Sequence, residues 1–135
     1  MYVACDKHGK KAISYVIEYL EQQHQSYENF FGPLETILPR VATGVKNGHR
    51  AIVSCGTGIG AEVGLNKFSG IRAVLASSPQ IATWSVEKDN CNVLCLVGWE
   101  ATEESINAIL DAWFSAKYDG NEKRLKMIEV FDTWH

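Results

Sequence analysis

Residues 50–60 read RAIVSCGTGIG. The first half is a short run of apolar and β-branched residues, which is typical of a strand buried on both faces of a sheet. The second half is a glycine-rich loop that opens a helix. Because ligands of open parallel sheets bind at the carboxyl ends of the strands, this stretch predicts a strand–loop–helix unit with a ligand site at Cys55.

Strands and helices are predicted to alternate on both sides of this stretch. The other predicted strands cover residues 1–5, 26–31, 71–75 and 92–97. Amphipathic patterns predict helices at 10–22, 34–46, 79–87 and 102–117, one after the glycine loop, and a last one from Gly120 to about Val130. This alternation favours βαβ units and a parallel sheet. We therefore expect an α/β fold in one domain, residues 1–135: a Rossmann-like three-layer sandwich with a five-stranded parallel sheet and a C-terminal helix.

The composition argues against several classes of function. A chain of 135 residues with 46% apolar residues can bury a real core. The net charge of −3 argues against nucleic acid or an anionic membrane as partner, and no apolar run approaches the ~20 residues of a membrane span. Residues 1–5 are predicted as a strand rather than a signal peptide, so we expect a cytoplasmic protein whose four cysteines are reduced.

The glycine-rich loop has two possible interpretations at this point. Glycines allow close approach of a ligand, helix-start N–H groups favour an anion, and the same position favours a thiolate at Cys55. A dinucleotide fingerprint would need G-x-G-x-x-G after the first strand, and a phosphate loop would need Gly-Lys-Ser/Thr; neither pattern fits here. The loop is therefore either a glycine turn beside a structural cysteine or an anion site beside a reactive one.

The run CGTGIG at 55–60, followed by NKFSGIRA at 66–73, resembles a segment of type B ribose-5-phosphate isomerases and of the galactose-6-phosphate isomerase B subunit. Three further segments are similar to that family in the same order: Cys5–Gly9 to its Asp-His-x-Gly, Asn92–Leu94 to its NVL, and Ala112–Gly120 to its AWL…YEGG. The resemblance implies an isomerase that interconverts an aldose and a ketose phosphate, pentose or hexose, through a cis-enediolate.

The resemblance also implies roles for individual residues. Cys55 matches the catalytic base, and Thr57 matches a hydroxyl that helps to handle the enediolate. The implied substrate-binding residues are Asp6, Lys7, His8, Gly56, Gly58, Gly60, Asn66, Lys88, Asn90 and Arg124, the glycines through amides that hold negative charge. No metal and no organic cofactor is implied.

This sequence differs from the family at several positions where family members bind their substrate. Lys7 stands in place of the histidine of Asp-His, Lys88 in place of a ring-opening histidine, and Arg124 matches only one of two arginines. We expect Lys7, with Arg40 or Arg124, to hold the anionic end of the substrate. The alternative is a non-catalytic or partner subunit, or a sugar-phosphate-binding protein of the same fold.

Two further expectations concern the surroundings of the site. Family sites are completed across a subunit interface, so the resemblance implies a homodimer or homotetramer. Trp99 follows the last predicted strand at the ligand-binding edge. Packing is the ordinary role of such a residue, but at this edge it could also stack on a sugar.

Overall fold

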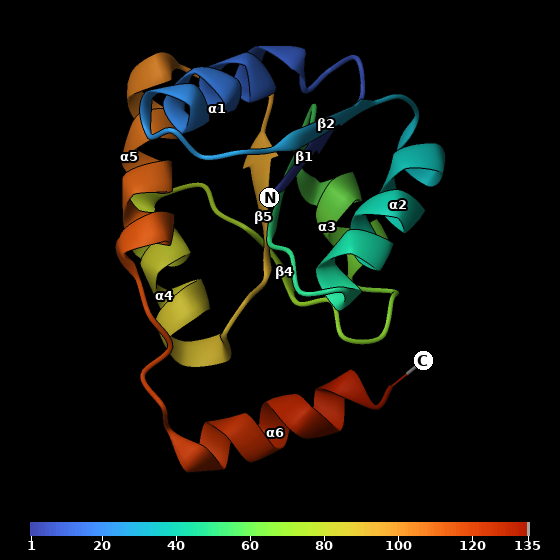
Figure 1. The fold of residues 1–135 in the computed structure, drawn as a ribbon, viewed down its shortest axis with the longest axis vertical. Helices are drawn as coiled ribbons and strands as arrows, with labels where there is room; N and C mark the ends of the chain where they lie inside the picture. The colour runs from blue at the N-terminus through green and yellow to red at the C-terminus, as the bar shows by residue number, and fades with distance from the viewer. Residues whose placement is uncertain (135) are drawn as a thin grey trace.

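The computed structural model describes residues 1–134 and shows a parallel five-stranded sheet with helices on both faces (Figure 1). The strands are β1 (Tyr2–Cys5), β2 (Glu28–Phe31), β3 (Ala51–Cys55), β4 (Ala73–Leu75) and β5 (Val93–Val97). Their order across the sheet is β2-β1-β3-β5-β4, and every neighbouring pair is parallel. All five carboxyl ends therefore lie at one edge of the sheet, which is the edge where the sequence predicts the ligand site.

The helices form the two outer layers. They are α1 (Lys10–Gln22), α2 (Leu34–Lys46), α3 (Ile59–Leu65), α4 (Pro79–Asp89), α5 (Glu103–Ser115) and α6 (Glu122–Asp132). Helices α1, α4 and α5 cover one face of the sheet, and α2 and α3 cover the other (Figure 1). Helix α6 lies beyond the amino ends of the strands, below the sheet in Figure 1. Among residues 1–134, no helix is both long and apolar enough to span a membrane.

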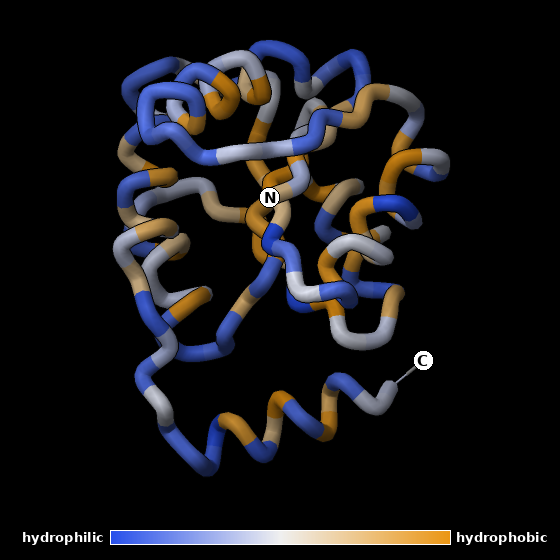
Figure 2. The backbone as a smooth tube through the Cα atoms, viewed as in Figure 1, coloured by the Kyte–Doolittle hydropathy of each residue, from blue (hydrophilic) through white to orange (hydrophobic). Residues whose placement is uncertain are grey.

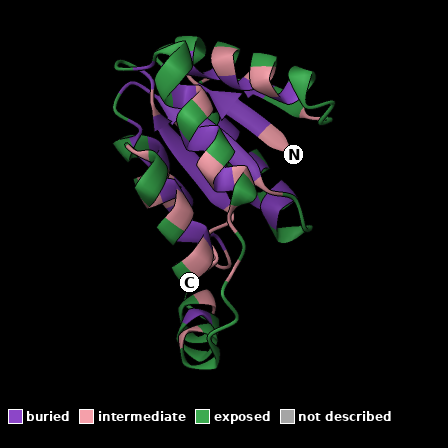
Figure 3. Ribbon diagram, turned by 90° about the vertical axis from the view of Figure 1, so that its left-hand side faces the viewer, coloured by how far each residue is buried: buried purple, intermediate pink, exposed green. Residues whose placement is uncertain are grey.

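Alternating strand residues divide the core into two apolar clusters. Ile52 and Leu94 face the α1, α4 and α5 layer, whereas Val53, Cys55 and Cys95 face α2 and α3. Strands β1, β3 and β5 are buried between helices whose outer faces are exposed (Figure 3), whereas the edge strand β2 is mostly exposed. Apolar residues line the inward sides of the helices (Figure 2). The near-continuous apolar runs in the sequence are explained by this burial on both faces.

The predicted order of strands and helices is confirmed, with differences at some boundaries. Strand β4 begins at Ala73, two residues later than predicted, because the preceding residues are held in a turn. The N–H of Ile71 donates to the carbonyl of Phe68 (3.2 Å), and the N–H of Arg72 donates to the side chain of Asn92 (2.8 Å). A side-chain hydrogen bond thus takes the place of a strand-to-strand bond at this position.

Backbone segments touch directly at the carboxyl ends of β1, β3 and β5. A Cβ atom on Gly9 would lie 2.3 Å from the carbonyl oxygen of Ser54. A Cβ atom on Gly98 would lie 2.4 Å from the carbonyl oxygen of His8 and 2.6 Å from that of Cys55. The three loops can pack this closely only because glycine stands at both positions.

We predict that Gly9→Ala lowers the free energy of unfolding by about 1–3 kcal/mol or more, measured by urea denaturation. Gly9 has φ −96°, which alanine adopts freely, so the effect would come from the contact with Ser54 and not from backbone strain. Gly60→Ala is the control, because its nearest neighbour would lie at 3.4 Å and the residue is helical. A Gly9→Ala protein as stable as this control would contradict the close packing.

Candidate active site

The site lies between β1 and β3, where the strand order changes direction. From β1 the chain continues to β2 on one side of the sheet, and from β3 it continues to β4 and β5 on the other side. Helices α1 and α3 leave the ends of the neighbouring strands β1 and β3 toward opposite faces. Such a divergence opens a crevice between the two loops, which in open α/β sheets is where ligands bind. Residues 6–9 form one side of the crevice and residues 56–58 the other.

Cys55 is the last residue of β3 and stands at the start of the glycine-rich loop. Its side chain faces the α2 and α3 layer and is 5% exposed. A Cβ on Gly60 would lie 3.9 Å from the Sγ of Cys55 and 3.4 Å from the side chain of Leu34. The thiol therefore sits beside the first turn of α3, close to Leu34.

The loop after Cys55 has a conformation that requires glycine. Gly58 has φ +75°, and a Cβ there would lie 2.8 Å from the carbonyl oxygen of Leu96. The side chain of Thr57 turns back on its own loop, because its Oγ1 accepts a hydrogen bond from the N–H of Ile59 (3.1 Å). The loop thus presents its backbone to the crevice at the start of α3, where the helix dipole favours a negative group.

Asp6, Lys7 and His8 line a cleft of about 530 Å³ at the end of β1. The Oδ1 atom of Asp6 accepts hydrogen bonds from the N–H groups of His8 (2.9 Å) and Gly9 (3.2 Å), which fixes the turn. The opposite wall of the cleft consists of Phe31, Gly32, Pro33, Leu34 and Glu35. Leu34 also lies beside Gly60, so this wall of the cleft comes close to the first turn of α3.

Trp99 connects the loops that follow β1, β3 and β5. Its backbone N–H donates to the carbonyl of Gly56 (2.9 Å), and its indole covers the same residue, since a Cβ on Gly56 would lie 2.4 Å from the ring. Its indole Nε1–H donates to Nδ1 of His8 (3.4 Å), and the two rings meet edge to face with centroids 5.5 Å apart. The sequence indicates that Trp99 lies at this edge, but no sequence pattern reports its contact with His8.

Four of the predicted site residues, Asn66 at the end of α3 and the three that follow, lie at the opposite edge of the sheet and apart from Cys55. Lys88 and Asn90 stand at the end of α4, which has returned to the amino ends of the strands, and Arg124 lies in α6 (Figure 1). Lys88 pairs with Asp119 (3.2 Å between Nζ and Oδ2), and Arg124 pairs with Asp89 (2.9 Å between Nη1 and Oδ1). Within one chain, the structure does not bring these three residues together with Cys55.

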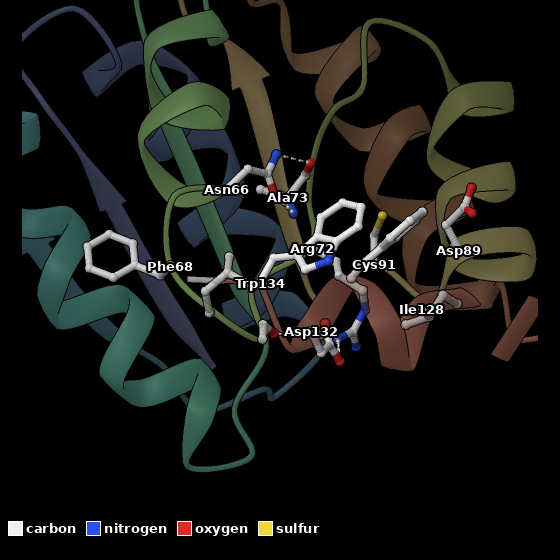
Figure 4. A pocket seen from close by; sticks show the side chains of 12 residues that line it. Asn66, Phe68, Arg72, Ala73, Asp89, Cys91, Ile128, Asp132 and Trp134 are labelled. Carbon is white, nitrogen blue, oxygen red and sulfur yellow. Dashed lines mark hydrogen bonds and ion pairs between the residues drawn. The ribbon is translucent and has the colours of Figure 1, made fainter. Parts of the chain in front are cut away.

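Asn66 and Arg40 have structural contacts in this chain. The side chain of Asn66 donates to the carbonyl of Ala73 (2.9 Å) and accepts from its N–H (2.8 Å), beside a second cavity of about 290 Å³ (Figure 4). The guanidinium of Arg40 lies over the ring of Phe30, 4.0 Å from its centroid. Of the basic residues expected to bind an anion, Lys7 is the one that lines the cleft beside Asp6.

Burial makes three of the four cysteines poor nucleophiles. It raises the pKa of Cys5 to about 11 and that of Cys91 to about 12, and it holds the pKa of Cys95 well above its usual value. These thiols stay protonated at neutral pH, whereas a nucleophile or a base has to be the thiolate. All four cysteines are free, as expected, and Cys55 is the one that adjoins the glycine-rich loop.

Comparisons with known proteins agree on one family. Residues 1–129 match the model of the Ribose/Galactose Isomerase family. Ribose-5-phosphate isomerase B of Escherichia coli K12 is 37% identical over 83 residues, which cover 60% of this chain and 56% of that protein. A probable ribose-5-phosphate isomerase B of Mycoplasma pneumoniae is 30% identical over 145 residues, which cover 98% of this chain and 94% of that protein.

A solved structure supports the same relationship. Ribose-5-phosphate isomerase B from Mycoplasma genitalium, crystallised with bound ribulose-5-phosphate, superposes on this chain with a TM-score of 0.89 at 25% identity. The superposition covers 98% of this chain and 93% of that one.

Proposed function

The chain belongs to the Ribose/Galactose Isomerase family, and from that membership we propose that it interconverts an aldose and a ketose phosphate through a cis-enediolate, with Cys55 as the base. The observation that carries the proposal is the position of Cys55, at the end of β3, directly before the glycine-rich loop and close to Leu34, which lines the cleft of Asp6. Such an enzyme needs a base next to an anion-stabilising loop, and these two features meet at Cys55.

The proposed reaction uses the two sides of the crevice for different tasks. The thiolate of Cys55 removes a proton from the carbon next to the carbonyl, and the resulting thiol, whose hydrogen can exchange with water, gives a proton to the adjacent carbon. The hydroxyl hydrogen passes between the two cis oxygens of the enediolate, so that the former carbonyl oxygen becomes a hydroxyl group and its neighbour becomes the new carbonyl. Negative charge develops on the substrate oxygens, where the amides of Gly56, Gly58 and Gly60 and the hydroxyl of Thr57 would stabilise it. Preorganised N–H groups of this kind are effective because they need no rearrangement during the reaction.

The substrate is held from the β1 side in this proposal. One oxygen of Asp6 is bound by two backbone N–H groups, which leaves Oδ2 for the hydroxyl groups of a sugar. Lys7 supplies a positive charge in the same cleft and would bind the phosphate as a point charge. We expect the protein to act in the cytoplasm, where sugar phosphates are metabolised.

A second copy of the chain would complete the site. Lys88, Asn90 and Arg124 lie at the edge opposite Cys55, so only another subunit can bring them to the substrate. On α3, next to the glycine-rich loop, Ile59 and Val63 are one turn apart and are 53% and 54% exposed. Exposed apolar side chains on one helix face are typical of an association surface. We therefore propose a homodimer or homotetramer.

We predict that Cys55→Ser and Cys55→Ala each reduce aldose–ketose turnover by ~100-fold or more, because a general base is lost. The affinity for a non-reacting alditol phosphate should stay within about threefold of wild type, since the cleft is unchanged. Cys95→Ala is the control: Cys95 lies inside β5 with no access to the cleft. Near-normal turnover by both Cys55 variants would refute the assignment.

We predict that two inactive variants restore each other when mixed. Arg124→Ala should remove substrate binding from one edge, and Cys55→Ser should remove proton transfer from the other. A mixed dimer would then contain one intact site, so mixing after reversible dissociation should recover up to about a quarter of wild-type turnover, on the ordinary statistics of subunit exchange.

The matched control pairs Cys55→Ser with Cys55→Ala, a mixture in which no intact site can form. If the first mixture recovers no more activity than this control, or if an active species sediments as a monomer, the shared site is wrong.

A further inference from the structure

The contact between Trp99 and His8 fixes the hydrogen on one nitrogen of the imidazole. The indole nitrogen of tryptophan is a donor only, so in the bond of 3.4 Å the Nδ1 atom of His8 must be the acceptor. A neutral imidazole that accepts at Nδ1 carries its hydrogen on Nε2. His8 therefore offers an N–H group, and not a lone pair, to whatever binds beside it.

Both rings are held by the backbone around them. The side chain of Trp99 belongs to a residue that is 66% exposed, yet both parts of this residue are held. Its backbone N–H donates to the carbonyl of Gly56, and its indole packs on that glycine. The backbone N–H of His8 donates to the carboxylate of Asp6, and the backbone carbonyl of His8 packs against Gly98. The backbone of His8 is thus fixed by Asp6 and Gly98, and its ring is placed by Trp99.

The cleft that His8 lines has a wall residue, Leu34, close to the reacting thiol. His8 and Leu34 are both part of its wall, and Leu34 lies beside Gly60, next to the Sγ of Cys55. A sugar phosphate is smaller than the cleft of about 530 Å³, so one molecule can bind there against His8 and reach past Leu34 toward Cys55. The charged groups that share the cleft with His8 are Asp6, Lys7 and Glu35.

We propose that His8 is an electrophilic catalytic residue of the isomerisation, and that Trp99 is the positioning residue that fixes its tautomer. The Nε2–H of His8 donates a hydrogen bond to the carbonyl oxygen of the substrate. This hydrogen bond becomes stronger as the oxygen gains negative charge in the enediolate. A neutral imidazole can polarise a carbonyl group in this way. This inference rests on the proposed function.

The proton balance of the reaction is unchanged by this role. Cys55 still takes a proton from one carbon and gives one to the next, and the hydroxyl hydrogen passes between the two cis oxygens of the enediolate. His8 shares its hydrogen with the former carbonyl oxygen without losing it. The N–H of Ile59, at the start of α3, is bonded to Thr57 and adds no further donor to the amides of the glycine-rich loop. His8 adds an N–H group from the β1 side of the crevice.

The tautomer can be observed directly. A long-range ¹H–¹⁵N correlation spectrum should show the ring of His8 in the Nε2–H form in the wild-type protein and a mixture of tautomers in Trp99→Phe, which keeps an aromatic ring but loses the donor. Trp84→Phe, at another exposed tryptophan, is the control. An Nδ1–H form in the wild-type protein would overturn the proposal.

The catalytic role is tested with a pair of ligands. One is a four-carbon phosphorylated hydroxamate, whose two cis oxygens mimic the enediolate of a pentose phosphate, and the other is the pentitol 5-phosphate, which has no carbonyl. We expect His8→Ala to weaken hydroxamate binding by ~10–100-fold more than pentitol phosphate binding, the loss typical of a hydrogen bond to a charged group. His8→Gln, which keeps an N–H donor, should restore part of this difference, and His24→Ala is the control.

The outcomes separate this inference from the function on which it rests. If the wild-type protein binds the hydroxamate and turns over a sugar phosphate, but His8→Ala weakens both ligands equally, His8 only shapes the cleft and the inference is wrong. If the wild-type protein neither binds the hydroxamate nor turns over any pentose or hexose phosphate, the proposed function itself fails.

Discussion

The backbone of Gly9 lies against the carbonyl of Ser54, and the backbone of Gly98 lies against those of His8 and Cys55. Through these contacts the loops at the ends of β1, β3 and β5 pack backbone against backbone. A side chain at Gly9 or Gly98 would clash with a neighbouring carbonyl group. The carboxylate of Asp6, the imidazole of His8 and the thiol of Cys55 are all attached to the segments that meet here. The arrangement of the candidate site therefore depends on two glycines that bring the three loops together.

A second constraint follows from the parallel sheet. Each helix returns the chain to the amino ends of the strands, so the predicted site residues lie partly at the carboxyl edge and partly at the amino edge of the sheet. The ends of α4 and α6 carry basic side chains that are paired with carboxylates in the single chain: Lys88 with Asp119 and Arg124 with Asp89. Both pairs are partly exposed, and exposed ion pairs of this kind stabilise a fold only slightly. An anionic substrate at a subunit interface could replace either carboxylate at small cost to the fold, so this pairing is compatible with the proposed role of Arg124.

The sequence predicts much of the fold because its signals are local. Apolar β-branched runs separated by amphipathic stretches are sufficient to place five strands and six helices, and the glycine-rich run after Cys55 marks the end of the strand that carries the site. The start of β4 is predicted less well, because the side chain of Asn92 bonds there across 20 residues of sequence. The bond between His8 and Trp99 joins residues 91 apart, and no local pattern reports it. Asn66 matches a family motif, yet only the folded chain shows that its amide is occupied by the backbone of Ala73.

In the proposed reaction, a base of this protein carries out proton transfer between two carbons of a sugar phosphate. The most direct test follows ribose 5-phosphate in D₂O by NMR as the wild-type protein brings it to equilibrium with the ketose. The proposed mechanism predicts that solvent deuterium enters the carbon that receives the proton, because a thiol hydrogen exchanges with water, and that little enters when Cys55 is replaced by alanine. Conversion in which the substrate hydrogen moves completely to the neighbouring carbon, with no deuterium from the solvent, would contradict it.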